Sequence, residues 1–387
     1  MGKFKTFISG AVLSLFFGVS PVSAELFGLS SFVLDNGMQV LVIPNHKAPI
    51  IKHMVWYKDG VFNDLISRNG GESNAFTSLD YTAYHQELDI SRLELAMFLE
   101  ADRMQNLKIT PEAFAKERDI VFQERKQVVD NNPLSYFGES MRKLLWQDHP
   151  YALSVGGTPE DIMAITKEDV ERFYEQFYAP NNAILVLSGD IDIKTAKELA
   201  EKYYGKVKSR PVGKKADFPK LSRRFKADMQ MRLEAANAPR LVRTYLAPSF
   251  NTDAGQIYAL SVFSKYLGEG ENSKLYKNLV LKQKKALAVS SSYDYADRSY
   301  GTFTIAAVPA EGVSREELKK VLDDAVAEAV SGINAAEVDK TKHKMLAGLV
   351  YLKDNPNDAA YIAGMLAAVG LSAEEIDNGD IHLRDVG

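Results

Sequence analysis

The stretch MVWYKDGVFNDLISRNGGESNAFTSLDYTAYH, from Met54 to His85, contains two segments that are typical of β-strands. The first, HMVWY, is almost continuously apolar, and the second, NAFTSLDYTAY, is rich in Phe, Thr and Tyr. Only nine residues, 61–69, lie between Gly60 and Gly70. Either this interval is a complete connection between two strands, or a segment that belongs there is missing.

The sequence around this stretch predicts an α+β fold. Residues 32–45 have the pattern of a hairpin, because Asn36-Gly37 suits a tight turn with positive φ. Helical periodicity or capping signals follow, with Ser91 and Thr110 expected to begin two of the helices. Further strands are predicted over 49–57, 183–191, 240–248, 286–295 and 300–309, and further helices over 91–107, 110–129, 166–178, 192–205, 255–268, 272–284, 314–330 and 334–354. Few of these elements form alternating βαβ units. We therefore expect two similar domains, each a mostly antiparallel sheet with helices packed on one face.

Length and composition bear on the number of domains and on the kind of partner. The chain has 387 residues and a formal net charge of −4, which suggests about two domains and gives no reason to expect a nucleic-acid partner. Residues 206–221 are basic, contain two prolines and lack periodicity, so they are interpreted as a linker. The predicted units are an N-terminal domain over 25–205 and a C-terminal domain over 222–387. Cysteine is absent, which excludes disulfides and a Cys-ligated zinc.

The first 24 residues, MGKFKTFISGAVLSLFFGVSPVSA, have the pattern of a secretory signal peptide. Two lysines precede a short apolar run, and small residues end the segment at Ala24. A retained N-terminal anchor is the alternative interpretation. No later segment is long and apolar enough to be expected to cross a membrane. The sequence thus predicts an exported, periplasmic protein whose mature chain starts at Glu25.

Several ordered motifs resemble those of one known family. They are FVLDNGMQVLVIPNHKAPIIKHMVWYK, GGESNAFTSLDYTAYHQ, LEADRMQNL, ERDIVFQERK, DNNP, HPY, FYAPNNAILVLSGDID, YLAPSF and YLGEGENSKLYKNLV. Together they resemble the insulinase/pitrilysin family of zinc metallopeptidases, in particular its two-domain bacterial and mitochondrial-processing-peptidase-like branch. The resemblance covers residues 29–377. It implies an inverted zinc motif, His-x-x-Glu-His, on a helix between the two strands of the opening stretch, and a third ligand, a Glu, on a later helix.

This sequence lacks the zinc motif. Its six histidines are His46, His53, His85, His149, His343 and His382, and none has another His four positions away. Two His with that spacing lie on one helical face and share the metal, so none of these six can form the pair. The interval 61–69 is therefore interpreted as lacking the catalytic helix. Zinc is the cofactor of the family, but we expect none to be bound by this chain, which should be inactive alone.

The resemblance assigns the remaining acidic residues of the site. Glu124 matches the third zinc ligand, and Glu117, seven residues earlier on the same helical face, matches another acidic position. Without the His pair, both are expected to be solvated or salt-bridged. His53 and His149 are expected to be packing or surface residues.

The resemblance also implies a site for peptides. In the family, the strand that matches SNAFTS is a sheet edge to which an extended peptide adds by backbone hydrogen bonds. Asn74, Ala75 and Phe76 stand at these positions, and Gly71, just before the strand, would let a ligand backbone approach closely. The alternative is an ordinary strand. The Gly-x-Gly of YLGEGENSKLY is weak evidence for a phosphate loop, because the third Gly and a βαβ frame are missing.

Three functions remain open from the sequence. The first is a non-catalytic subunit that binds peptides or unfolded polypeptide segments, together with a homologous catalytic chain or a second copy of itself. The second is an internally deleted form of an active zinc endopeptidase, in which case the gap is an artefact and the second domain, which ends where the family continues into another helix, is truncated too. The third is a structural or assembly subunit.

Overall fold

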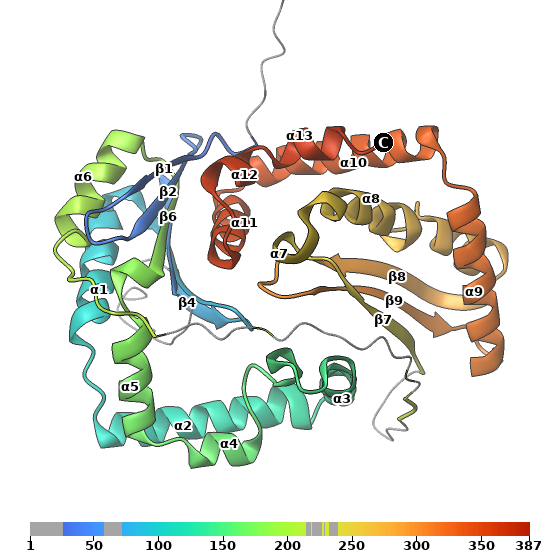
Figure 1. Ribbon diagram of the computed structural model, residues 1–387, viewed down its shortest axis with the longest axis horizontal. Helices are drawn as coiled ribbons and strands as arrows, with labels where there is room; N and C mark the ends of the chain where they lie inside the picture. The colour runs from blue at the N-terminus through green and yellow to red at the C-terminus, as the bar shows by residue number, and fades with distance from the viewer. Residues whose placement is uncertain (1–25, 58–71, 214–217, 219–226, 228, 232–238) are drawn as a thin grey trace, which may run out of the picture.

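The computed structural model describes residues 26–57, 72–213, 218, 227, 229–231 and 239–387. Within them the chain forms two β-sheets on which helices pack (Figure 1). All strand pairs but one are antiparallel, so the predicted α+β class with mostly antiparallel sheets is confirmed. The predicted signal segment 1–24, the interval 61–69, Gly71 and much of the predicted linker 206–221 lie outside the described residues.

The first sheet has six strands in the order β1-β2-β6-β3-β5-β4. Their bounds are β1 Ser30–Val33, β2 Gln39–Pro44, β3 Ile50–Tyr57, β4 Glu72–Thr77, β5 Thr82–Asp89 and β6 Ala183–Gly189. The predicted hairpin of β1 and β2 is confirmed, and Gly37 takes the positive φ, +87°, that its turn requires. β6 is fully buried because it lies in the middle of the sheet, parallel to β2 and antiparallel to β3.

Helices cover both faces of this sheet. On one face α1 (Leu93–Asn106), α5 (Lys167–Phe177) and α6 (Ile193–Tyr203) contribute to the larger core. The other face is covered by α11 (Pro356–Val369), which comes from the C-terminal part of the sequence (Figure 1). A run of buried alanines and Gly364 lets α11 approach Trp56 of β3 closely. The predicted division of the chain at 206–221 stays a prediction. Although α11 follows this segment in the sequence, it packs on the sheet formed by residues that precede it.

The second sheet is smaller, with three strands in the order β7-β9-β8. The strands are β7 Leu241–Ala247, β8 Ala286–Asp294 and β9 Gly301–Pro309. Its core is completed by α8 (Ile257–Gly268), by α9 (Arg315–Ser331) and by a π-helix, η7 (Tyr276–Lys282). α10 (Ala335–Asp354) packs against α8, and α12 (Ala373–Asp377) and α13 (Gly379–Arg384) follow α11.

The remaining helices are α2 Pro111–Arg125, α3 Pro133–Trp146, α4 Pro159–Ala164 and α7 Phe250–Asp253, with the π-helix η3 Lys126–Asp130 and the short 3-10 helices η2 Ile90–Arg92, η4 Pro150–Ala152, η5 Pro180–Asn182 and η6 Ala254–Gln256. Thr110 caps α2 through the Ala113 N–H, as predicted. The prediction for Ser91 is wrong, because η2 precedes α1 and Asp89 accepts the Ser91 N–H. None of the helices in the described residues has the length and apolarity of a membrane span.

Candidate functional site

The strand β4, which carries three of the predicted peptide-binding residues, is an edge of the first sheet. It pairs only with β5 among the described residues, with Asn74 opposite His85 and Phe76 opposite Ala83. At the turn between the two strands, Ser78 lies opposite Tyr81, and its N–H donates to the Tyr81 carbonyl at 2.8 Å. Ser78 and Tyr81 are therefore a hydrogen-bonded pair of the antiparallel ladder. Because such pairs alternate with non-bonded pairs, the backbone groups of residues 75 and 77 point away from β5.

The position of Ala75 agrees with this alternation. Its N–H is bonded to Asn74 Oδ1 at 2.8 Å rather than to β5. The bond is exposed and joins neighbouring residues, so an added strand can replace it at little cost. The edge therefore offers main-chain donors and acceptors of the kind that β-strand addition uses.

The face of β4 that is turned towards α11 is aromatic. The Phe76 ring lies 5.4 Å from that of Trp56 and 5.3 Å from that of Tyr361, measured between centroids. Trp56 is fully buried, whereas Tyr361 is 42% exposed. Since Tyr361 belongs to α11, this surface beside the edge is shared between the first sheet and a helix from the C-terminal part of the chain.

His85 lies on the same face of the sheet and is neutral at pH 7. Burial lowers its pKa to about 4, and the positive charge of Lys52 acts in the same direction, against Glu87. Burial also lowers the pKa of Lys52, while Glu87 and Glu72 raise it. His85 Nδ1 has no hydrogen-bond partner among the described residues. A single neutral imidazole has one acceptor nitrogen and does not by itself make a metal site.

The predicted remnant of the zinc site is separate and open. Glu117 and Glu124 are both exposed on α2, a helix whose one buried side chain is that of Arg125. Neither takes part in an ion pair with another described residue. The exposed apolar side chains Ile120 and Val121 lie between them on the helix.

The described donor set does not fit zinc. All six histidines are described, and both ring nitrogens of His53 are engaged, by Gln86 and Tyr204. His149 likewise bonds to Ser299 and to a backbone N–H. In the part of the chain that the structure describes, no group of three His, Cys, Asp or Glu side chains is placed to hold a metal ion. No hydrolytic step is therefore derived for this chain.

The turn that follows β4 is anchored to the second sheet by a buried network. Asp80 Oδ2 accepts hydrogen bonds from the Tyr151 hydroxyl and, at 3.0 Å, from the Arg298 N–H. The Ser299 N–H donates to Tyr151 Oη at 3.1 Å, and Ser299 Oγ lies 2.9 Å from His149 Nε2. His149 is thus a packing residue, as expected. This network fixes the end of the candidate edge against the loop that joins β8 and β9.

The same junction holds a carboxyl group with an unusual pKa. Burial, together with the carboxylates of Asp294 and Asp80, raises the pKa of Asp297 to about 8, although Arg142 acts in the opposite direction. The pKa of Asp294 is raised as well, mainly because the residue is surrounded by protein atoms, although part of its side chain is exposed to solvent. Asp297 is therefore mostly protonated at neutral pH, because close carboxylates cannot all ionise. The sequence did not reveal this group of carboxylates, because Asp80 and Asp297 are far apart in the chain and come together only in the folded structure.

Comparison with known proteins places this geometry in a family. The family model described as Insulinase (Peptidase family M16) matches residues 52–159. The model described as Peptidase M16 inactive domain matches residues 164–345, so the two together span most of the chain. The chain belongs to peptidase family M16. The predicted family resemblance is confirmed.

Relatives of this M16 chain include proteins named zinc proteases. The Helicobacter pylori protein named zinc protease PqqE is 27% identical over 373 residues, which is 87% of this chain and 82% of the relative. The Mycobacterium leprae protein named uncharacterized zinc protease ML0855 is also 27% identical, over 74% of this chain and 64% of the relative. Zinc is thus the metal of the family, and the M16 chain described here lacks its His pair.

Solved structures confirm the M16 fold. The crystal structure of a protease from Helicobacter pylori has a TM-score of 0.78 and 24% identity, over 93% of this chain and 94% of that one. The structure of a peptidase M16 inactive domain from Pseudomonas fluorescens has a TM-score of 0.67 and 17% identity, over 92% and 95%. The first half of the periplasmic protease PqqL from Escherichia coli has a TM-score of 0.72 and 16% identity, over 92% and 86%.

Proposed function

We propose that this chain is a non-catalytic M16 protein that binds extended peptides or unfolded polypeptide segments along β4. One combination of features supports the proposal: the strand that carries Asn74, Ala75 and Phe76 is an edge with outward backbone groups, while the sequence holds no His pair. An extended peptide that adds to this edge would place alternate side chains over the Phe76 and Tyr361 rings. We include Gly71, which precedes the strand, in the proposed site.

We propose a homologous M16 chain, or a second copy of this one, as the partner. The support is the exposed surface of α2, where Ile120 is 47% and Val121 37% exposed beside Glu117 and Glu124. Nonpolar side chains grouped in this way are typical of surfaces that contact another chain. We also propose that the protein is exported to the periplasm after loss of residues 1–24, with units at 25–205 and 222–387 joined by 206–221.

The first experiment measures metal content and cleavage on the same purified sample. We expect less than stoichiometric zinc by elemental analysis and no cleavage of an unstructured peptide. Stoichiometric zinc with cleavage would overturn the proposal, and would instead support an active zinc endopeptidase. Binding of a homologous M16 chain without any binding of peptide would support a structural or assembly subunit.

The second experiment tests the edge with a matched pair of proline substitutions. Ala75→Pro removes an outward N–H on β4, and Ser31→Pro removes one on β1, the opposite edge of the same sheet. Proline is tolerated at such positions because the pairing with the neighbouring strand is kept. We expect Ala75→Pro to weaken binding of a fluorescent unfolded peptide by about tenfold or more, and Ser31→Pro to leave it unchanged. Equal affinity of the two variants would refute a site at β4.

A further inference from the structure

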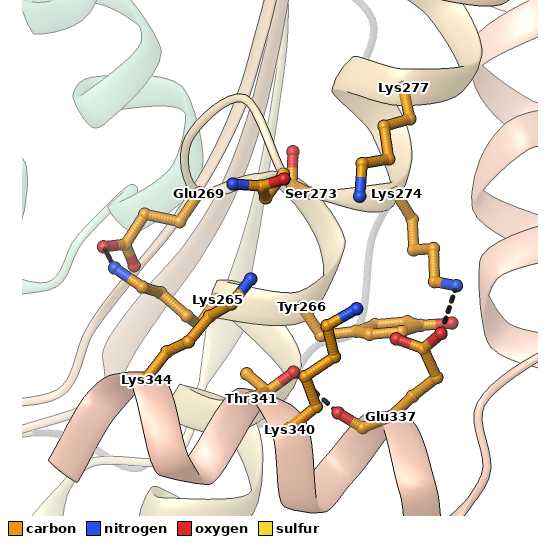
Figure 2. A pocket seen from close by; sticks show the side chains of 11 residues that line it. Lys265, Tyr266, Glu269, Ser273, Lys274, Lys277, Glu337, Lys340, Thr341 and Lys344 are labelled. Atoms are coloured by element: carbon orange, nitrogen blue, oxygen red, sulfur yellow. Dashed lines mark hydrogen bonds and ion pairs between the residues drawn. The ribbon is translucent and has the colours of Figure 1, made fainter. Parts of the chain in front are cut away.

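A hollow of about 60 Å³ lies on the second half of the molecule, between α8, α10 and the segment that leads into η7 (Figure 2). All of its lining residues come from positions 265–277 and 337–344, so it is separate from the β4 edge. Its volume holds about four water molecules. This is the size of a small polyatomic group rather than of a whole metabolite, and the hollow is open on one side.

Positive charge dominates the lining. Five lysines and two glutamates surround the hollow. Two of the lysines are paired, Lys265 with Glu269 and Lys274 with Glu337 at 3.0 Å. Lys277, Lys340 and Lys344 form no ion pair within 4.0 Å in the part of the chain that the structure describes. The hollow therefore carries an excess of three positive charges.

The three remaining lysines converge. In Figure 2, Lys340 and Lys344 rise from α10 towards the loop that carries Ser273, and Lys277 points down towards the same space from the helix above. Two of them act on Glu337, whose pKa is lowered by its hydrogen bond to Lys274 and also by the charges of Lys340 and Lys277. Ammonium groups that converge repel one another, and an anion between them removes that repulsion.

We propose that this hollow binds the phosphate group of a small soluble molecule. Lysines act on a phosphate as point charges from several directions, which suits three ammonium groups on two different helices better than it suits a planar carboxylate. The Asn272 amide, which also lines the hollow, supplies a neutral hydrogen-bond donor. The open side leaves room for the rest of a phosphomonoester to extend into solvent.

The test uses the full chain and titrates it with inorganic phosphate or with glycerol 3-phosphate, followed by calorimetry and phosphorus NMR at constant ionic strength. The variant Lys340→Gln/Lys344→Gln removes two of the converging charges. The control Lys282→Gln/Lys320→Gln removes two exposed lysines of the same half that do not line the hollow. We expect saturable binding that falls by about tenfold or more in the first variant and is unchanged in the control.

The outcomes decide between a site and general attraction to positive charge. Tighter binding of glycerol 3-phosphate would assign the hollow to phosphomonoesters, and tighter binding of inorganic phosphate would assign it to the free ion. Equal weakening in both double variants, or an equal response to sodium chloride at the same ionic strength, would overturn the proposal. A failure to bind either phosphate probe would overturn it as well, and would leave the proposal for β4 untouched.

Discussion

The contact between α11 and the first sheet can be tested at Gly364. An added Cβ at this position would lie 2.1 Å from Trp56 Cε2 and Nε1. Non-bonded carbon atoms prefer a separation of about 3.5–4.0 Å, so either the helix or the indole must move by more than about 1.4 Å. Trp56 has no room to do so, because it is fully buried and three aromatic rings lie within 5.8 Å of it, measured between centroids.

The expected cost follows from these contacts. Overpacking a close-packed interior costs about 1–3 kcal/mol, and Gly364 is at the upper end because its neighbour is a rigid ring system. Alanine in place of glycine within a helix returns about 1 kcal/mol. We therefore expect Gly364→Ala to lower the free energy of unfolding by about 2 kcal/mol. That is a large part of the 5–15 kcal/mol, roughly, that holds a typical domain.

Gly348 provides the matched control. It lies within α10, it is exposed, and a Cβ there would meet nothing within 4 Å. Gly348→Ala should therefore raise the free energy of unfolding by about 0.5–1 kcal/mol through helix propensity alone. Urea unfolding followed by tryptophan fluorescence and by far-ultraviolet circular dichroism measures both variants. If Gly364→Ala were as stable as Gly348→Ala, the proposed packing of α11 on Trp56 would be wrong.

Two further predictions concern buried charges. Because the pKa of Asp297 is about 8 in the folded state and its ordinary value is 3.8, the folded state binds an extra proton between these pH values, and stability falls as pH rises from about 4 to 8. Asp297→Asn removes this dependence. Measured by thermal unfolding, the variant should be more stable than the natural chain by about 2 kcal/mol at pH 9 and little different at pH 4. The full pKa shift sets an upper limit of about 5.7 kcal/mol on this difference, and the coupling of Asp297 to Asp294 and Asp80 reduces it. A natural chain whose stability did not change across this range would contradict the assignment. Arg125 is 7% exposed, forms ion pairs with Asp130 and Glu139 and donates a hydrogen bond to the Gly157 carbonyl, so Arg125→Ala should cost about 2–3 kcal/mol. Arg172→Ala, which breaks an exposed pair with Asp169, should cost less than about 0.5 kcal/mol. Equal melting temperatures of the two arginine variants would show that the buried cluster does not stabilise the α2–α3 region.

The sequence predicted the local structure of this protein well, because local rules govern it. Asn36-Gly37 forms its turn, Thr110 caps α2, and the apolar run from Ala183 forms a buried strand. The failure at Ser91 is also local, since Asp89, two residues earlier, accepts the Ser91 N–H and caps a 3-10 turn that precedes the helix. What periodicity did not reveal is which strand the run pairs with.

The long-range features were beyond this kind of reasoning. No helix was predicted over α11, and nothing in the spacing of its alanines says that it covers a sheet whose strands lie much earlier in the chain. Asp80 and Tyr151 are unremarkable in isolation, and their bond joins segments that are 71 residues apart. The absence of the His pair, in contrast, was decidable at once, because a spacing within one helix is a local property.

Local strand pairing and long-range contacts together explain how the edge strand β4 can be held in place in a chain that lacks the zinc motif. β4 is held by β5 on one side, its turn is fixed by Asp80 to the loop between β8 and β9, and its aromatic face is completed by Tyr361 of α11. None of these contacts involves the interval 61–69 or the exposed carboxylates of α2. Hydrolysis depends on a few side chains within one helix, whereas the edge depends on the whole arrangement of the two sheets. The arrangement that would hold a peptide therefore does not depend on the His pair that this sequence lacks.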